Sequence, residues 1–275
     1  MANRMKSIGR HFRKIFGLQS EEDLAREAAK RQWKKDIVVA AQFVLPLVEL
    51  LRPVLVEGCE LIRIGNKAGD GGYVCADPKG RVDATYSLGI SDEFSWDEDI
   101  VSMNIPIYQF DCTIAEGPMK HELVTFYKEC LGTFNGKKVT SIEQALARHS
   151  HLENDRLFLK MDIEGGEWSI LDYIAEQKHP NFWQIACELH DLCDPKVMMR
   201  FFKIMKKLSV HYYVIHTHAN NAGKMMPIGE VVFPELLEVT LLRRDGQAAQ
   251  PCSLRRDLDH PNVTNNRDLS TDHLW

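Results

Sequence analysis

The sequence predicts an α/β fold, in which a mostly parallel β-sheet is covered by helices on both faces. From residue 60 onward, short apolar runs alternate with segments that have helical patterns and helix-start signals. Polar and ionisable residues recur directly after these runs. Ligands bind at the carboxyl ends of the strands in such sheets, so these residues are the first candidates for a functional site.

Six apolar runs are the expected strands of this sheet. They are residues 84–90, 105–110, 157–161, 183–189, 211–217 and 236–242. Helices are expected between several of them: residues 141–149 open with a capping box, and residues 194–208 open with an aspartate cap and a proline at the first helical position.

A long helix is expected before the sheet, over residues 20–51. Ser20 would be its N-cap, with acidic residues in the first turn. Pro46 should bend or break it, since proline lacks the backbone N–H and clashes with the preceding turn. We expect residues 1–55 to form a basic extension with this helix, and residues 56–275 to form the main domain.

The charge is unevenly distributed along the 275 residues. The first 35 hold ten Lys and Arg against four Asp and Glu, while the remainder holds 24 against 35. An acidic body without a basic cluster argues against nucleic acid as a partner. The basic segment 1–18 is either a solvated leader or a helix that contacts an anionic membrane surface.

The seven cysteines are odd in number and have no metal-type CxxC pairs, which favours reduced thiols in a cytoplasmic protein. No run approaches the roughly 20 apolar residues that a membrane span needs. We therefore expect a cytoplasmic protein, with possible peripheral contact at the inner face of a membrane. The sequence does not predict an oligomeric state.

The first expected strand and the next one end in residues typical of a nucleoside site. Gly89 follows the first strand and would let the backbone approach a ligand closely, and Asp111 ends the next strand and could accept both hydroxyls of a ribose. There is no GxGxxG pattern, so a dinucleotide is not expected. The alternative is an ordinary strand-to-helix turn with an incidental aspartate.

The chain resembles the FkbM-like S-adenosylmethionine-dependent methyltransferases over roughly residues 60–260. The segments that carry the resemblance are "GDGGYV" (69–74), "YSLGISDEFSWDEDI" (86–100), "IYQFDCTI" (107–114), "VTFYKECLG" (124–132), "LKMDIEGGEWSIL" (159–171) and "IHTHANN" (215–221). The resemblance implies a Rossmann-like class I methyltransferase fold, with seven strands and an antiparallel edge strand in the last strand pair. It also implies O-methylation of a sugar, a glycolipid precursor or another small molecule.

What the resemblance implies for the cofactor can be placed residue by residue. S-adenosylmethionine would contact Gly89, Ser91, Asp92, Asp111 and Asp162. The chain has "SLGIS" where methyltransferases have a more familiar glycine-rich motif, so the contacts there depart from the common pattern.

Methyl transfer to a hydroxyl also needs a group that removes the proton. His190 and His218 are the candidate bases because histidine has an ordinary pKa of about 6.5, and Asp162 or Glu188 would orient them. A divalent ion is the alternative, held by Asp162, Glu188 and either histidine. We do not predict a metal ion from the sequence.

Five residues are expected to contact the acceptor: Asp70, Tyr73, Glu164, Asn220 and Asn221. Plain turns at "GDGGYV" and "HANN" are the alternative. Glu167 is assigned only to the first turn of a helix, where negative charge is favourable. Two rival functions remain: a cofactor-binding protein without turnover, and a membrane-surface scaffold.

Overall fold

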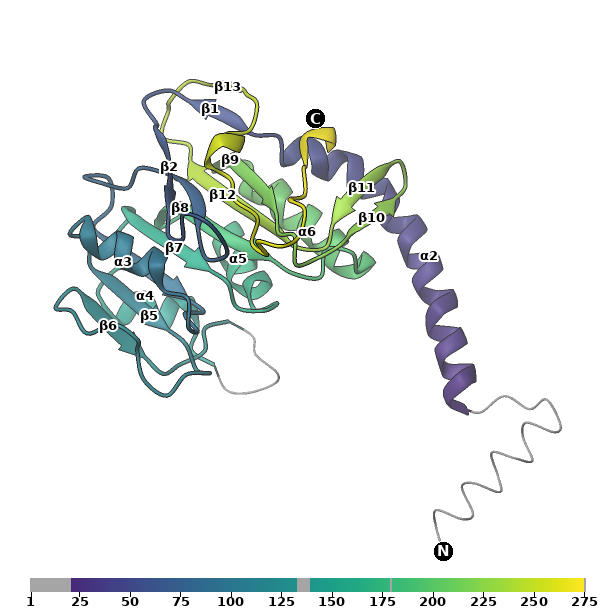
Figure 1. The fold of residues 1–275 in the computed structure, drawn as a ribbon, viewed down its shortest axis with the longest axis horizontal. Coiled ribbons are helices and arrows are strands. Elements are labelled where there is room, and N and C mark those ends of the chain that lie inside the picture. The colour runs from purple at the N-terminus through teal and green to yellow at the C-terminus, as the bar shows by residue number, and fades with distance from the viewer. Residues whose placement is uncertain (1–20, 133–138, 179, 275) are drawn as a thin grey trace, which may run out of the picture.

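The structure is a computed structural model that describes residues 21–132, 139–178 and 180–274. Its centre is a seven-stranded sheet with the order β6-β5-β4-β7-β8-β12-β9 (Figure 1). The strands are β4 (Ala84–Leu88), β5 (Ile107–Phe110), β6 (Val124–Tyr127), β7 (Leu157–Met161), β8 (Phe182–Leu189), β9 (Tyr212–Ala219) and β12 (Leu237–Arg243). The predicted α/β fold with a seven-stranded sheet is confirmed.

The antiparallel strand belongs to the last strand pair, as expected, but it is not the edge strand. β12 pairs antiparallel with both β8 and β9, so it is second from the edge, and β9 is the edge strand. After β9 the chain reverses through the hairpin of β10 (Met225–Ile228) and β11 (Val231–Pro234), and β12 returns between the two earlier strands. All six predicted strands form, whereas β6 was not recognised as a strand.

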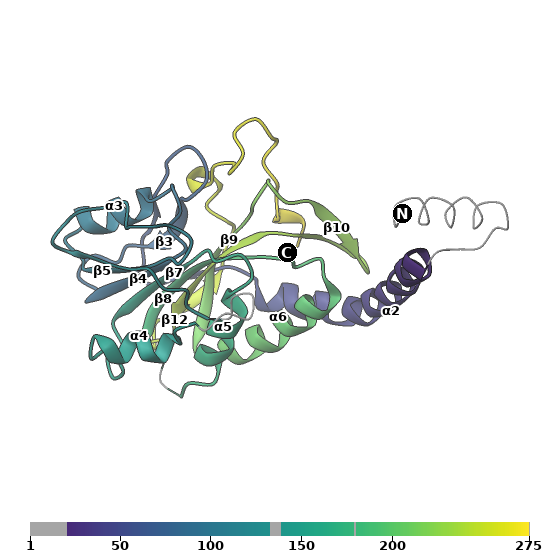
Figure 2. The same ribbon diagram turned by 90° about the horizontal axis from the view of Figure 1, so that it is seen from below.

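The two faces of the sheet are covered differently, as Figure 2 shows. One face packs against α2 (Glu21–Leu50), α4 (Ile142–Arg148), α5 (Glu167–Ala175) and α6 (Pro195–Leu208), and this face holds the larger apolar cluster. The other face packs against α3 (Ser95–Ser102) and the hairpin of β2 (Leu61–Ile64) and β3 (Tyr73–Ala76). Trp96 and Trp168 are buried core residues.

The C-terminal segment runs over the carboxyl edge of the sheet. It begins with β13 (Ala249–Pro251), which pairs with β1 (Val54–Val56), and includes the short 3-10 helices Arg256–Leu258 and Asp272–Leu274. Leu269 forms an isolated bridge with Ala219 at the end of β9. Residues far apart in the sequence therefore meet at this edge.

The helix α2 continues through Pro46, so the expected break does not occur. Pro46 is exposed, while Val44, Leu47 and Val48 beside it are buried against the domain. Packing on both sides of the proline holds the helix together. The first half of α2 is exposed and projects from the body (Figure 1). Ser20 and the basic segment 1–18 lie outside the described residues.

The other predicted helix starts are confirmed. Ser141 accepts a hydrogen bond from the backbone N–H of Gln144, whose side chain accepts one from the N–H of Ser141. Asp194 accepts from the N–H of Lys196, with Pro195 at the start of the helix. The predicted boundary at residue 55 falls within β1, and the second half of α2 belongs to the main core.

Cys112 and Cys130 form a disulfide, so the expectation of reduced thiols is wrong for this pair. The two residues follow β5 and β6, which are neighbours in the sheet, and their Cα atoms lie 4.9 Å apart. Sequence spacing gave no sign of this pairing. Within the described part of the chain, no helix combines the length and apolar character needed to cross a membrane.

Replacing Leu47 with alanine should lower the free energy of unfolding by about 2–5 kcal/mol, because its fully buried side chain helps to dock α2. Urea unfolding followed by circular dichroism measures this difference. Leu45→Ala is the matched control on the same helix, since Leu45 is 51% exposed. Equal effects of the two substitutions would contradict the observed packing of α2.

Candidate functional site

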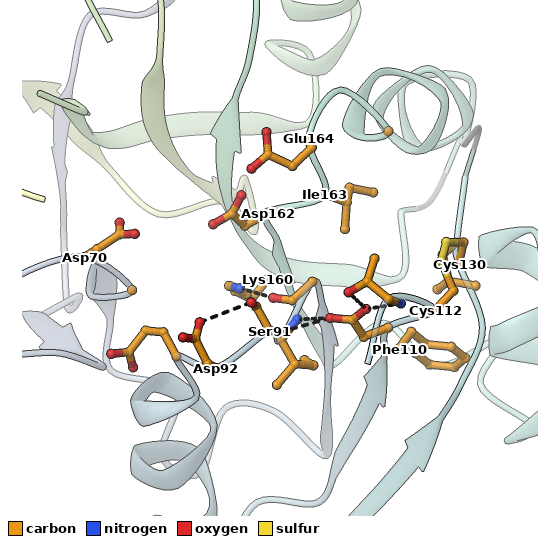
Figure 3. A pocket seen from close by; sticks show the side chains of 18 residues that line it. Asp70, Ser91, Asp92, Phe110, Cys112, Cys130, Lys160, Asp162, Ile163 and Glu164 are labelled. Atoms are coloured by element: carbon orange, nitrogen blue, oxygen red, sulfur yellow. Dashed lines mark hydrogen bonds between the residues drawn. A yellow bond between two sulfur atoms is a disulfide. The ribbon is translucent and has the colours of Figure 1, made fainter. Parts of the chain in front are cut away.

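A cavity of about 320 Å³ lies at the carboxyl ends of β4, β5 and β7. The chain passes from β4 outward to β5 and β6, and then crosses to β7 and β8 on the other side of β4. The strand order therefore reverses between β4 and β7, which is where ligands bind in open α/β sheets. Figure 3 shows Asp70, Asp92 and Asp162 facing the space inside this cavity.

Gly89 allows the ends of β4 and β7 to approach closely at the cavity floor. Its φ is +74°, and a Cβ atom built on it would lie 1.7 Å from the carbonyl oxygen of Asp162. The N–H of Asp162 donates to the carbonyl of Leu88, and Lys160 Nζ donates to the carbonyl of Gly89 at 2.7 Å. Any other residue at position 89 would push these two strand ends apart.

Asp111 lines the cavity as predicted, but its carboxylate is already engaged. Oδ2 accepts hydrogen bonds from the N–H groups of Ile90 and Ser91, at 2.9 and 3.0 Å. Oδ1 accepts from the N–H and the hydroxyl of Thr113, at 2.7 and 2.6 Å. A carboxylate offers about four acceptor positions, so a ribose hydroxyl could bind only by displacing one of these donors.

The pKa of Asp111 reflects these contacts. Burial acts to raise it, but the hydrogen bonds from Thr113, Ser91 and Ile90 outweigh burial, and the pKa lies below its ordinary value. Asp111 therefore stays ionised and fixes the loop after β4. Ser91 in that loop has a φ of +51°, and its hydroxyl donates to Asp92 at 3.2 Å.

The cavity wall is strongly acidic. Among the described residues that line it are six carboxylic acids and one basic residue, Lys160. The acids are Asp70, Asp92, Glu93, Asp111, Asp162 and Glu164. A wall of this charge attracts cations and repels phosphate groups.

His190 lies beside this cavity, at the end of β8, among four carboxylates. Its Nδ1 is 3.1 Å from Oε1 of Glu167, which also accepts from the N–H of Ile163 at 3.0 Å. Its Nε2 is 3.4 Å from Glu164, 3.6 Å from Glu188 and 3.9 Å from Asp162. The structure thus brings together three of the four predicted catalytic residues, Asp162, His190 and Glu188.

The pKa values in this cluster shift strongly. Burial raises the pKa of Asp162, in spite of the nearby Lys160 and His190. Burial also raises the pKa of Glu188 well above its ordinary value, and repulsion from Asp162 and Glu238 adds to it. Burial acts to lower the pKa of His190, but Glu167 and the other carboxylates outweigh it and raise the pKa to about 9. Unless a cation replaces its proton, His190 is charged at neutral pH and does not serve as the predicted free base.

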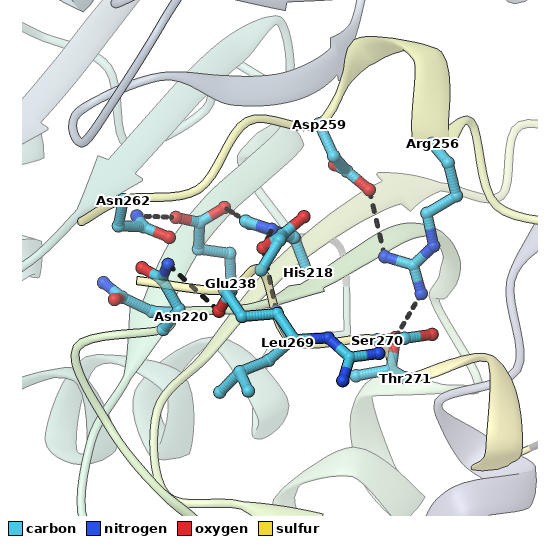
Figure 4. A network of polar contacts seen from close by, with 12 residues as sticks. His218, Asn220, Glu238, Arg256, Asp259, Asn262, Leu269, Ser270 and Thr271 are labelled. Carbon is cyan, nitrogen blue, oxygen red and sulfur yellow. Dashed lines mark hydrogen bonds and ion pairs between the residues drawn. The ribbon is translucent and has the colours of Figure 1, made fainter. Parts of the chain in front are cut away.

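The role predicted for His218 needs correction. His218 is buried, and each ring nitrogen faces a carboxylate: Nδ1 is 3.1 Å from Glu238 and Nε2 is 3.0 Å from Asp268 (Figure 4). Burial acts to lower its pKa, but these carboxylates raise it to about 10. His218 does not line the cavity, and as a buried imidazolium it ties the C-terminal segment to the sheet.

The two asparagines predicted to bind an acceptor also have structural partners. Asn221 donates to the carbonyl of Val263 and accepts from its N–H, so it too holds the C-terminal segment. Asn220 is buried, and its amide nitrogen lies 3.0 Å from both carboxylate oxygens of Glu188. Asn220 therefore positions Glu188, and neither asparagine lines the cavity.

The "GDGGYV" segment forms the turn of the β2–β3 hairpin, and it also reaches the cavity. Asp70 and Gly71 line the wall, and Glu164 lines it from the β7 side. Tyr73 is buried, with its hydroxyl 3.5 Å from Oδ2 of Asp162. The segment is therefore both a turn and part of the cavity wall, and its contact with an acceptor stays a prediction.

Several site residues were missed by sequence reasoning. Glu167 was assigned to the helix dipole, although it is fully buried and contacts His190. Glu238 is a lone acid within the apolar run 236–242, and this isolated charge was an available signal. Asn262 bridges Asp70 and Glu238 at 2.9 and 2.6 Å, and no local pattern could have indicated this contact.

A scan of protein-family models gave no match to this chain, and a search among curated proteins found no similar sequence.

The ion pairs of His218 should make stability depend on pH. Because the folded pKa is raised to about 10, their contribution is complete below the unfolded value of about 6.5 and is lost as the pH rises through about 10. Urea unfolding of the wild-type protein and of His218→Gln should show a difference that shrinks over this range. His211→Gln, outside this network, is the control. A difference that stays constant with pH would contradict the charged state.

Proposed function

We propose that this chain is an S-adenosylmethionine-dependent methyltransferase, which transfers the methyl group to a hydroxyl of a sugar, a glycolipid precursor or another small molecule. The observation that carries the proposal is the acidic cavity at the switch between β4 and β7. The cofactor has a sulfonium, an ammonium and a carboxylate group, which together give it a net positive charge, and it has no phosphate. Its charge therefore matches this wall, whereas the pyrophosphate of a dinucleotide or a nucleoside triphosphate would be repelled.

The loop after β4 supports the placement of the cofactor. Gly89 permits a close approach of the backbone, and Asp111 holds the N–H groups of Ile90 and Ser91 in place. Of the four donors to Asp111, three are backbone N–H groups and only the Thr113 hydroxyl can rotate freely. A ribose hydroxyl would therefore bind Asp111 in place of the Thr113 hydroxyl. The seven strands with one antiparallel member agree with the fold that the resemblance implies.

Asp162 is best placed to accept the acceptor's proton. In methyl transfer, the hydroxyl oxygen bonds to the methyl carbon, the carbon–sulfur bond breaks, and the hydroxyl proton must leave. Asp162 lines the cavity, and burial raises its pKa, so it is a stronger base than an exposed carboxylate. His190 and Glu188 would then set the electrostatic environment of the Asp162 carboxylate.

Isothermal titration of the full chain tests the cofactor. We expect S-adenosylmethionine to bind, with an affinity that falls as salt rises, and ATP and NAD to give no binding. Gly89→Ala should abolish binding, because its Cβ would collide with the Asp162 carbonyl. Gly80→Ala is the matched control, as Gly80 has a similar φ of +71° with no atom nearby. Binding of ATP or NAD in preference to S-adenosylmethionine would refute the proposal.

Asp162→Asn tests the base. We expect acceptor-dependent release of S-adenosylhomocysteine, measured at saturating cofactor, to fall by about 10²–10⁴-fold. Cofactor affinity should fall much less, because five other acids of the wall remain. Asp83→Asn is the control. Asp83 pairs with Arg156 at the amino end of β4, whereas the cavity lies at the carboxyl end of that strand. If the wild-type protein binds the cofactor but releases no product with any acceptor in a broad glycan panel, the rival function without turnover is favoured.

A further inference from the structure

We propose that Asp162, Glu164, Glu188 and His190 form a binding site for one divalent cation of the Mn²⁺ type. The ligands would be Nε2 of the imidazole and one oxygen of each carboxylate. A role for this ion in methyl transfer rests on the proposed function, whereas binding of the ion does not.

The spacing around His190 Nε2 fits shared coordination better than hydrogen bonding. The three carboxylate oxygens lie 3.4, 3.6 and 3.9 Å away, from Glu164, Glu188 and Asp162. Hydrogen bonds between nitrogen and oxygen are typically about 2.7–3.2 Å long. Ligand atoms that each lie about 2.1 Å from one ion are about 3.0–3.5 Å from one another, so only a small contraction is needed.

The other ring nitrogen is held in the way that metal-binding histidines require. Nδ1 lies 3.1 Å from the buried carboxylate of Glu167, which the N–H of Ile163 also fixes. A proton on Nδ1 leaves the lone pair on Nε2, directed at the three carboxylates. This is the carboxylate–histidine arrangement that orients imidazole ligands in metal sites. The Glu188 carboxylate is oriented too, because the amide nitrogen of Asn220 lies 3.0 Å from both of its oxygens and donates to them.

A second group of acids lies nearby and consists of Asp70, Glu188 and Glu238, which also come within ligand distance of one another. Glu188 is also 3.6 Å from Nε2 of His190, whereas Asp70 and Glu238 already have other partners. The amide of Asn262 donates to Asp70 and to Glu238, and the other oxygen of Glu238 faces His218. By contrast, Asp162, Glu164 and His190 face one another without such a bridge among the described residues. The ion is therefore placed at His190.

The donor set indicates the kind of ion. One imidazole nitrogen with three carboxylate oxygens is harder than the cysteine and histidine sets of structural zinc sites. Ca²⁺ and Mg²⁺ prefer oxygen ligands alone, whereas Mn²⁺ accepts both carboxylate and imidazole. Asp162 and Glu164 line the cavity, so the remaining coordination positions would face a bound acceptor.

Titration of metal-free protein with Mn²⁺, followed by electron paramagnetic resonance without any cofactor, tests the site. We expect one ion per chain, with a ¹⁴N coupling in pulsed spectra that His190→Gln removes. Glu164→Gln should weaken binding by at least about 10-fold. The side chain of Glu164 is 82% exposed, so this variant should fold even if His190→Gln does not. Asp92→Asn, an acid of the same cavity outside the ligand set, should keep the wild-type affinity.

Two results would overturn the proposal. One is the absence of saturable Mn²⁺ uptake by the wild-type chain. The other is uptake that Glu164→Gln leaves unchanged, or whose ¹⁴N coupling persists in His190→Gln. Because no cofactor or acceptor is present, these outcomes do not depend on whether the chain transfers methyl groups.

Discussion

The burial of carboxylates at one edge of the sheet is the constraint on which the rest of this structure depends. Glu167, Glu188 and Glu238 are buried, and Asp162 lies beside them. Charges brought this close without compensation would repel one another at a large cost in free energy. The surrounding residues are arranged to reduce that cost, and the same arrangement produces the electrostatic character of the cavity.

Compensation comes from three directions. Lys160 reaches the cavity floor from the central strand, and His218 carries a charge between Glu238 and Asp268. The C-terminal segment contributes Asn262 and the pair of Asp259 with buried His216. This segment therefore completes the site, although it lies outside the strands that build the sheet. Its contact with His218, through Asp268, is charged because the pKa of His218 is raised to about 10, so the stability of the site is tied to pH.

The α/β fold and the cavity at the strand ends could be predicted from the sequence, because strand hydrophobicity and helix caps are local signals. The two candidate histidines could not be distinguished from the sequence, because the environment of a side chain depends on distant residues. His218 and His190 are both polar residues near the ends of strands, and the sequence does not distinguish them. In the structure, however, His218 contacts Asp268 and His190 contacts Glu167. The disulfide and the antiparallel position of β12 likewise arise from strand order, which no short pattern specifies.

A crystal structure of the chain soaked with S-adenosylhomocysteine and Mn²⁺, with anomalous data at the manganese edge, tests the central claim most directly. We expect the nucleoside between the ends of β4 and β7, with its ribose next to Asp111, and an anomalous peak about 2.2 Å from Nε2 of His190. A nucleoside bound away from the β4–β7 switch, or a peak outside the cluster around His190, would contradict this account.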